Sequence, residues 1–161
     1  SIALYLKKVH NLVVGERTAE DIKIKIGSAF PNNDFDKTSI EVRGLHLSSG
    51  LPRSINLTSG EIREAMADPL NKIVEAVKRT LERTPPELAA DIVDRGIMLA
   101  GGGALVRGIS DLLSDETGIF THIAEDPLLC VVNGCGEVLD DFKKLRRVVD
   151  TPDFARNAVR D

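Results

Sequence analysis

The sequence predicts an α/β protein in which short strands alternate with amphipathic helices. The stretch DRGIMLAGGGALVRGISDLLSDETG, residues 94–118, places three successive glycines between a short apolar run and apolar residues at helical spacing. This order is typical of a strand, a turn and a helix. Upstream, residues 38–47 and 53–59 alternate apolar and polar side chains, which is the period of half-buried strands. Helical periodicity in most of the remaining segments completes the α/β pattern.

Composition narrows the function classes. The 161-residue chain is 42% hydrophobic, which is enough for a packed core, and carries a net charge of −4. Aromatic residues make up 4% and tryptophan is absent, so a nucleic-acid partner is not expected. No apolar run approaches the roughly 18 residues of a membrane span, and the first residues lack a signal-peptide pattern. We therefore expect a cytoplasmic protein.

The cysteines and histidines do not form a metal-ligand pattern. Cys130 and Cys135 are five residues apart in one predicted helix, so they point to different faces and suit neither a disulfide nor zinc. We expect both to be small core residues. The histidines at positions 10, 46 and 122 are scattered singly, and no metal site is expected.

Two helices are predicted at the start of the chain. A stripe at Ile2, Leu6, Val9 and Val13 begins at the first residues, which suggests that the chain begins inside an element and that a part lies upstream. The second helix opens at ERTAEDIKIKIGSA. Its Thr18 and Asp21 resemble a capping box, and Gly27 suits its end.

A hairpin and two further helices follow. TSIEVRGLHL and RSINLTS are the predicted strands, joined by SSGLP in a loop longer than two residues. Thr58 and Glu61 form a predicted capping box for a long helix, which Pro69 bends or divides. Thr84, as N-cap before Pro85, predicts the start of the helix PPELAADIVD.

The glycine cluster allows two interpretations. Ile97 to Ala100 is a predicted buried strand that turns at Gly101. Leu105, Ile109, Leu112 and Leu113 share one face of the predicted helix that follows. Three residues without Cβ let a backbone approach a nucleotide, and a Cβ at Gly102 would crowd either that ligand or a backbone with positive φ. The alternative is a plain tight connection.

The last part of the chain repeats the α/β pattern. Residues 119–124, IFTHIA, are a predicted strand, and Asp126-Pro127 is the predicted start of a helix through LLCVVNGCGEVLDDF. Gly134 and Gly136 weaken that helix, which we explain by close packing against a neighbour. The last eleven residues, TPDFARNAVRD, carry few apolar groups, and a loose tail is expected.

Several longer stretches together resemble a known family. They are GERTAEDIKIKIGSA, EVRG, GLPRSI, RTPPELAADIVDRGIMLAGGGALVRGI and AEDPLLCVVNGCGEVL. From Ser1 to Leu139 the chain is similar to the second half of MreB, a family of bacterial actin-like filament proteins that determine cell shape. The resemblance implies the second lobe of the actin-like ATPase fold, with a ribonuclease H-like large subdomain and a small α+β subdomain.

The resemblance also implies a division of the chain. Residues 1–16 would be a helix leading in from an upstream part, and residues 17–80 the small subdomain with its helices and hairpin. Residues 81–148 would form the large subdomain with the glycine loop, and residues 149–161 a loose C-terminal tail.

The family binds adenosine between a helix of the small subdomain and a glycine loop of the large one. The resemblance assigns cofactor contact to Glu20, Asp21, Ile22, Lys23, Gly101, Gly102, Gly103 and Ala104. A carboxylate accepts hydrogen bonds from ribose hydroxyls, and a lysine stem covers a base while its ammonium stays in water. Asp21 and Ile22 would contribute chiefly through backbone, and Glu16 is a further candidate. From the residues alone, Glu20 and Lys23 are an exposed helix pair worth about 0.2 to 0.5 kcal/mol.

The implied cofactor is ATP with Mg²⁺, the metal being held mainly by the first lobe. Phosphate loops and the acidic residue that positions water belong to that lobe in the family, so we assign no catalytic or metal-binding residue here. The implied function is the nucleotide-binding half of an ATPase that forms head-to-tail filaments directing cell shape and cell-wall synthesis. Membrane proteins of those processes are the implied partners, with membrane attachment through the N-terminal part. The alternatives are an interaction module and a chaperone-type ATPase lobe.

Overall fold

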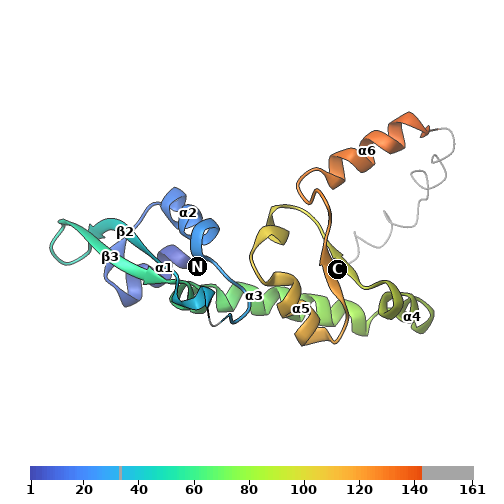
Figure 1. Cartoon of the computed structure of the whole chain (residues 1–161), viewed down its shortest axis with the longest axis horizontal. Helices are drawn as coiled ribbons and strands as arrows, with labels where there is room; N and C mark the ends of the chain where they lie inside the picture. The colour runs from blue at the N-terminus through green and yellow to red at the C-terminus, as the bar shows by residue number, and fades with distance from the viewer. Residues whose placement is uncertain (33, 143–161) are drawn as a thin grey trace, which may run out of the picture.

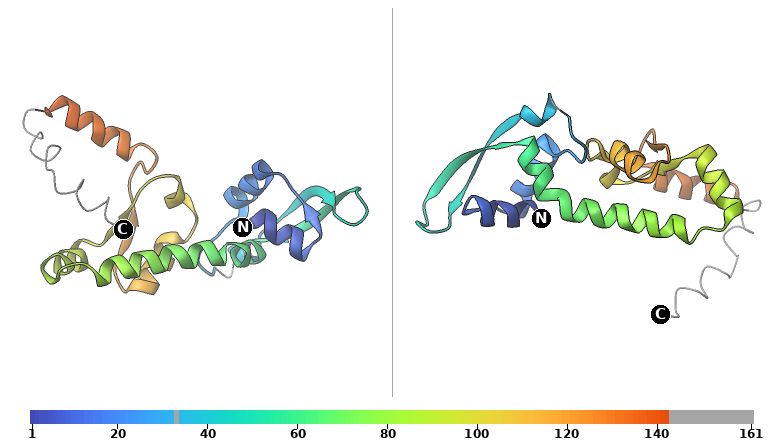
Figure 2. Two further views of the ribbon diagram at one scale, coloured as in Figure 1. Left: turned by 180° about the vertical axis from the view of Figure 1, so that it is seen from behind. Right: turned by 90° about the horizontal axis from the view of Figure 1, so that it is seen from below.

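The computed structural model describes residues 1–32 and 34–142, so the tail predicted at 149–161 lies outside the described residues. The long helix α3 (Ser59–Glu82) runs through the molecule and contacts elements on both sides of it in the sequence (Figure 1, Figure 2). Residues 1–58 form an N-terminal part at one end of α3, and residues 83–142 form a C-terminal part at the other. The boundary implied between residues 80 and 81 falls in the last turn of α3 and stays a proposal.

The N-terminal part is a three-stranded antiparallel sheet packed against helices. Its elements are α1 (Ile2–Val9), β1 (Leu12–Val13), α2 (Glu16–Ile26), the 3₁₀ turn η1 (Phe35–Lys37), β2 (Ser39–His46) and β3 (Pro52–Thr58). The strand order is β1-β2-β3, and Val42 pairs with Ile55 in the predicted hairpin. Leu6, Leu12, Leu57 and Ile62 are completely buried in the core between sheet and helices.

Two predictions for the first residues are wrong. The helix stripe does not reach Val13, because α1 ends at Val9 and Asn11 takes a left-handed conformation with φ 51°. Leu12 and Val13 instead pair with His46 and Leu45 as β1, which buries Leu12 beneath the sheet. Thr18 does not cap α2 either, since the N-cap is Gly15 and Thr18 already lies in the first turn.

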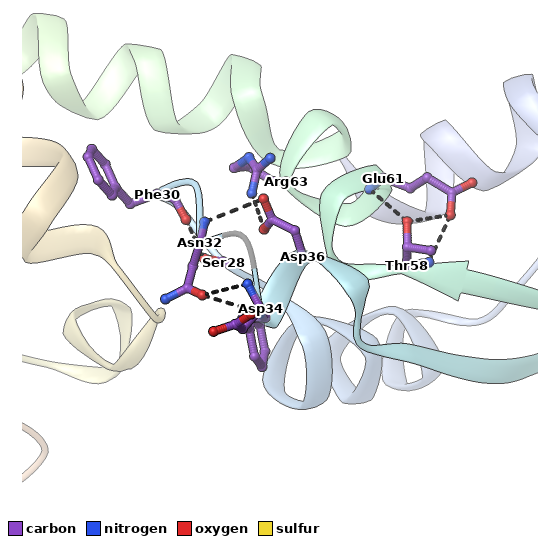
Figure 3. Close-up of polar contacts among 9 residues, drawn as sticks. Ser28, Phe30, Asn32, Asp34, Asp36, Thr58, Glu61 and Arg63 are labelled. Atoms are coloured by element: carbon purple, nitrogen blue, oxygen red, sulfur yellow. Dashed lines mark hydrogen bonds and ion pairs between the residues drawn. The ribbon is translucent and has the colours of Figure 1, made fainter.

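The capping box of α3 is confirmed. The Thr58 hydroxyl donates to the Glu61 carboxylate at 2.8 Å and accepts the Glu61 N–H, and the Thr58 N–H donates to the same carboxylate at 2.8 Å (Figure 3). Pro69 does not divide the helix, which is continuous over 24 residues. The helix buries Ile62, Met66, Leu70 and Val74 along one stripe, and this packing offsets the hydrogen bond that proline removes.

The C-terminal part has a two-stranded parallel sheet with helices around it. Its elements are α4 (Pro86–Arg95), β4 (Ile97–Leu99), the 3₁₀ turn η2 (Gly102–Leu105), α5 (Ile109–Thr117), β5 (Thr121–Ile123) and α6 (Cys130–Asp140). Ile97 pairs with Thr121 in the parallel register, and α5 packs on β5. Of the described residues, none belongs to a helix both long and apolar enough to cross a bilayer.

Three predicted helix starts are displaced. Leu105 lies in η2 rather than on the following helix, because Gly108 with φ 72° separates the turn from α5. The N-cap of α4 is Pro85, while the Thr84 hydroxyl donates back to the Thr80 carbonyl of α3 at 2.8 Å. The helix α6 begins at Cys130, after the Asp126 carbonyl has accepted the N–H groups of Leu129 and Cys130.

The expectations of packing around α6 are wrong for the described part of the chain. None of the 11 residues of α6 is buried, with Cys130 half-buried and Cys135 exposed, so neither cysteine is a core residue. No described atom outside the helix's own backbone lies within 4 Å of the position of a Cβ at Gly134 or Gly136. The helix stands away from α4 and α5 in Figure 1. Sequence periodicity identifies the apolar face of a helix, but it does not show which element, if any, covers that face.

The capping box makes the stability of this part depend on pH. Burial alone would raise the pKa of Glu61, but the hydrogen bonds from Thr58 and the nearby His10 outweigh it, so its folded pKa lies below the ordinary value of 4.5. Stability from this carboxylate is therefore present above about pH 4.5 and lost as the pH falls through the folded pKa.

We expect Glu61→Gln to lower the free energy of unfolding at pH 7 by about 1 kcal/mol, the scale of a helix cap. The variant should also lose part of the acid-induced fall in stability, because glutamine does not titrate. Urea unfolding between pH 3 and 7 measures both effects, and Glu75→Gln, at an exposed position of the same helix, is the control. Parallel pH profiles for Glu61→Gln and the parent would contradict this role.

Candidate functional site

A pocket lies where α2 faces the glycine turn η2. Its volume is about 300 Å³. Glu20, Lys23, Ile24 and Gly27 of α2 and its end line one wall, and Gly102, Leu105, Val106 and Arg107 line the other. The sequence prediction that this helix and this glycine cluster face each other therefore agrees with the geometry, although the two segments are about 80 residues apart.

Glu20 and Lys23 lie together on the pocket side of α2. The Lys23 Nζ is 2.7 Å from the Glu20 Oε1, and both side chains are partly exposed. A second, more polar hollow of about 360 Å³ lies on the other side of this pair and includes Glu16, Ala19 and Ser1. The carboxylate is thus reachable from solvent and is oriented by its own lysine, which suits a group that accepts hydrogen bonds from a ligand.

The glycine turn is shaped by backbone contacts. Gly101 has φ 81°, a conformation that favours glycine, and its N–H donates to the Pro127 carbonyl at 2.6 Å. Gly102 lines the pocket without positive φ, and a Cβ there would meet the Leu128 Cδ2 at an ordinary 3.6 Å. The constraint on φ therefore belongs to Gly101 and not to Gly102. Gly103 has open space around it, and Ala104 is buried beneath the turn.

The remaining predicted residues do not line this pocket. Ile22 is 2% exposed and belongs to the core, so its side chain faces away from the pocket. Asp21 lines a different hollow, between α2 and β2, together with Arg43 and Lys25. Gly101, Gly103 and Ala104 adjoin the lining residue Gly102 but do not line the pocket themselves. Their roles in binding stay predictions.

The sequence reasoning missed the apolar lining. Ile24 is 69% exposed and Leu105 is 57% exposed, and together with Val106 they give the pocket apolar surface on both walls. Ile24 stands between Lys23 and Lys25, and an isoleucine among these charged residues is a sequence signal for the apolar lining. Periodicity predicts Leu105 on the core face of the following helix, but the break at Gly108 leaves it in η2, where it lines the pocket.

The pocket combines one carboxylate, two cations and apolar walls. Such a site can hold a flat apolar group between Ile24 and Leu105 while Glu20 accepts hydrogen bonds from hydroxyls. Among the described residues there is no cluster of three or more His, Cys, Asp or Glu side chains able to hold a metal ion. These features suit the nucleoside end of a nucleotide.

The fold is part of an actin-like ATPase fold, as solved structures show. The chain is similar to MreB5 of Spiroplasma citri bound to AMPPNP, with a TM-score of 0.83 and 38% identity over 89% of this chain and 42% of that one. The ADP-bound form of MreB5 gives a TM-score of 0.82 at 36% identity, over 93% of this chain and 44% of that one. MamK in its double helical filament, at 17% identity and a TM-score of 0.60 over 76% of this chain and 37% of that one, shows the fold alone.

The sequence comparisons identify the family. A family model described as MreB/Mbl protein matches residues 1–147. The cell shape-determining protein Mbl of Bacillus subtilis is 48% identical over 88% of this chain and 42% of its own length. The cell shape-determining protein MreB of Escherichia coli is 49% identical over 87% of this chain and 40% of its own length. The chain belongs to the MreB/Mbl family of actin-like, cell shape-determining proteins, and it spans about two fifths of the length of these relatives.

We expect Gly102→Asp to weaken ATP binding strongly while the thermal transition without nucleotide changes little. The protein has room for a Cβ at this position, and a carboxylate added to this wall of the pocket would repel the phosphates of any nucleotide bound there. Titration with a fluorescent ATP analogue and a thermal melt of the same sample measure the two quantities. Gly101→Ala, where φ is 81°, is the matched control and should lose thermal stability. Equal losses of stability in both variants would favour a purely structural turn.

Proposed function

We propose that this chain is the nucleotide-binding second lobe of an actin-like protein that forms ATP-dependent, membrane-associated filaments directing cell shape and cell-wall synthesis. The observation that carries the proposal is the pocket between α2 and η2. It lies in a fold whose relatives have been solved bound to AMPPNP and to ADP. We call the longer polypeptide to which this lobe would belong the intact protein.

The pocket would hold the adenosine of ATP. Apolar surface from Ile24 and Leu105 suits the two faces of a base, and the carboxylate of Glu20 suits the ribose hydroxyls. The Lys23 stem would cover the base edge while its ammonium remains beside Glu20 in water. Glu20 and Lys23 are the residues of the α2 wall whose side chains can form hydrogen bonds, and this assignment gives each of them a role.

The phosphates and Mg²⁺ would be held mainly by the first lobe. Mg²⁺ is usually bound through one or two carboxylates together with substrate phosphates and water. Of the residues that line this pocket, Glu20 is the carboxylate, and it is already paired with Lys23. Phosphoryl transfer depends on positioning and charge neutralisation at the γ-phosphate, so ATP hydrolysis would belong to the intact protein.

Filament assembly is the second component of the proposal. MamK, which shares the fold at 17% identity, has been solved as a double helical filament, so the fold is compatible with the self-association proposed here. A head-to-tail contact is heterologous, so each subunit needs two different complementary surfaces. Cell-shape and cell-wall synthesis membrane proteins would be the further partners, with membrane attachment through the first lobe and the filament lying in the cytoplasm.

We expect Glu20→Ala to weaken ATP binding by the intact protein by roughly 1 to 3 kcal/mol, the scale for losing a charged hydrogen-bond partner. Glu41→Ala is the matched control, because Glu41 is an exposed carboxylate on β2 outside the pocket. Equilibrium titration with a fluorescent ATP analogue measures the loss. Unchanged affinity in a folded Glu20→Ala variant would remove this residue from the site.

We expect the isolated chain to block polymerisation of the intact protein, because it offers one end of a heterologous contact without continuing it. Sedimentation with ATP measures the effect, and the pelleted fraction should fall as this chain is added in up to about tenfold excess. The same chain denatured beforehand is the control. Pelleting that the excess leaves unchanged, or pelleting of this chain alone as filaments, would show the assembly inference to be wrong.

A further inference from the structure

Arg107, on the η2 wall of the pocket, contacts the N-terminal part of the chain in two different ways. Its backbone carbonyl accepts the N–H of Ala29 at 2.7 Å, just beyond the end of α2. Its guanidinium carbon lies 3.6 Å from the centroid of the Phe35 ring in η1. One residue of the η2 wall is therefore tied to the N-terminal part through both its backbone and its side chain.

The ring on which Arg107 stacks is held in place by its own neighbours. The Asn32 Oδ1 accepts the N–H groups of Asp34 and Phe35, each at 3.1 Å, which closes the turn before η1. The Asp36 carboxylate pairs with Arg63 of α3 and accepts the Asn32 N–H (Figure 3). Phe35 is thus anchored to the long helix by the adjacent residue.

The backbone next to Arg107 packs closely against the segment that follows α2. Gly108 has φ 72°, and a Cβ there would lie 2.8 Å from the Phe30 Cβ. The Ser28 hydroxyl donates to the Phe30 carbonyl at 2.8 Å, and Ser28 is 1% exposed (Figure 3). The segment that leaves α2 and the segment that leaves η2 are therefore held in one fixed register beside the pocket.

We propose that Arg107 is a positioning residue of the nucleotide pocket. Its backbone bond to Ala29 ties the η2 wall to the end of α2, and its stacking on Phe35 holds that wall against η1, so that the separation at which adenosine fits depends on the anchored position of η1. This inference rests on the proposed function, since it concerns the same pocket. Arginine suits the role because its planar group stacks on an aromatic face, whereas lysine offers a point charge on a flexible stem.

The test is a set of variants of the intact protein titrated with a fluorescent ATP analogue. We expect Arg107→Ala and Phe35→Ala each to weaken binding about 3- to 10-fold, the scale of one partly exposed cation–π contact. The double variant should be no weaker than the weaker single variant, because both changes break the same contact. Phe35→Tyr keeps the ring and should restore the parent affinity, while Arg107→Lys should not. The melting temperature without nucleotide identifies any variant that has simply unfolded.

The outcomes separate this inference from the proposed function. Arg43→Ala, an exposed arginine on β2 outside the pocket, is the control and should bind like the parent. If the parent binds ATP but Phe35→Ala does too with equal affinity, the positioning role is wrong. A loss of affinity in Arg107→Ala without any loss in Phe35→Ala would show that the cation acts on the nucleotide directly and not through Phe35. If the parent does not bind the analogue, the proposed function and this inference both fail.

Discussion

The structure depends on the packing of α3. This helix contacts α1, α2, β3 and η1 of the N-terminal part and α5 of the C-terminal part, so both parts of the chain pack on it. Its start is fixed by the Thr58 and Glu61 hydrogen bonds, and its buried stripe supplies a large share of the core. Most helical stability in proteins comes from packing of an amphipathic face, and α3 continues through Pro69 because one of its faces is covered.

The pocket follows from a second, smaller contact. Residues 28 and 107 form an isolated parallel bridge, and the Ala29 N–H bonds to the Arg107 carbonyl beside it. Phe30 and Gly108 approach so closely that a side chain at Gly108 would collide. Since α3 sets the spacing of the two parts on one side and this bridge sets it on the other, α2 and η2 face each other across a defined gap.

The residues that line the pocket come from two segments that are far apart in the sequence, residues 20–27 and residues 102–107. Glu20 and Lys23 are three residues apart on one helix, so their pairing is a local property. Leu105 and Arg107 lie in the pocket wall because Gly108, where the backbone is left-handed, separates them from α5. The polar half of the site is thus set by helix geometry, and the opposite wall by a turn.

Local signals in the sequence determined much of this protein. The capping box at Thr58, the alternation around Val42 and Ile55, the glycine turn after Leu99 and the acidic–basic pair on α2 all depend on neighbours within a few residues. Tertiary structure alone decided that Leu12 and Val13 form a strand, because β2 supplies their hydrogen bonds from more than 30 residues away. It also decided that Leu105 is exposed, that no residue of α6 is buried, and that Arg107 stacks on Phe35. Periodicity shows that a residue has an apolar face to cover, but the element that covers it is set by packing across long sequence distances.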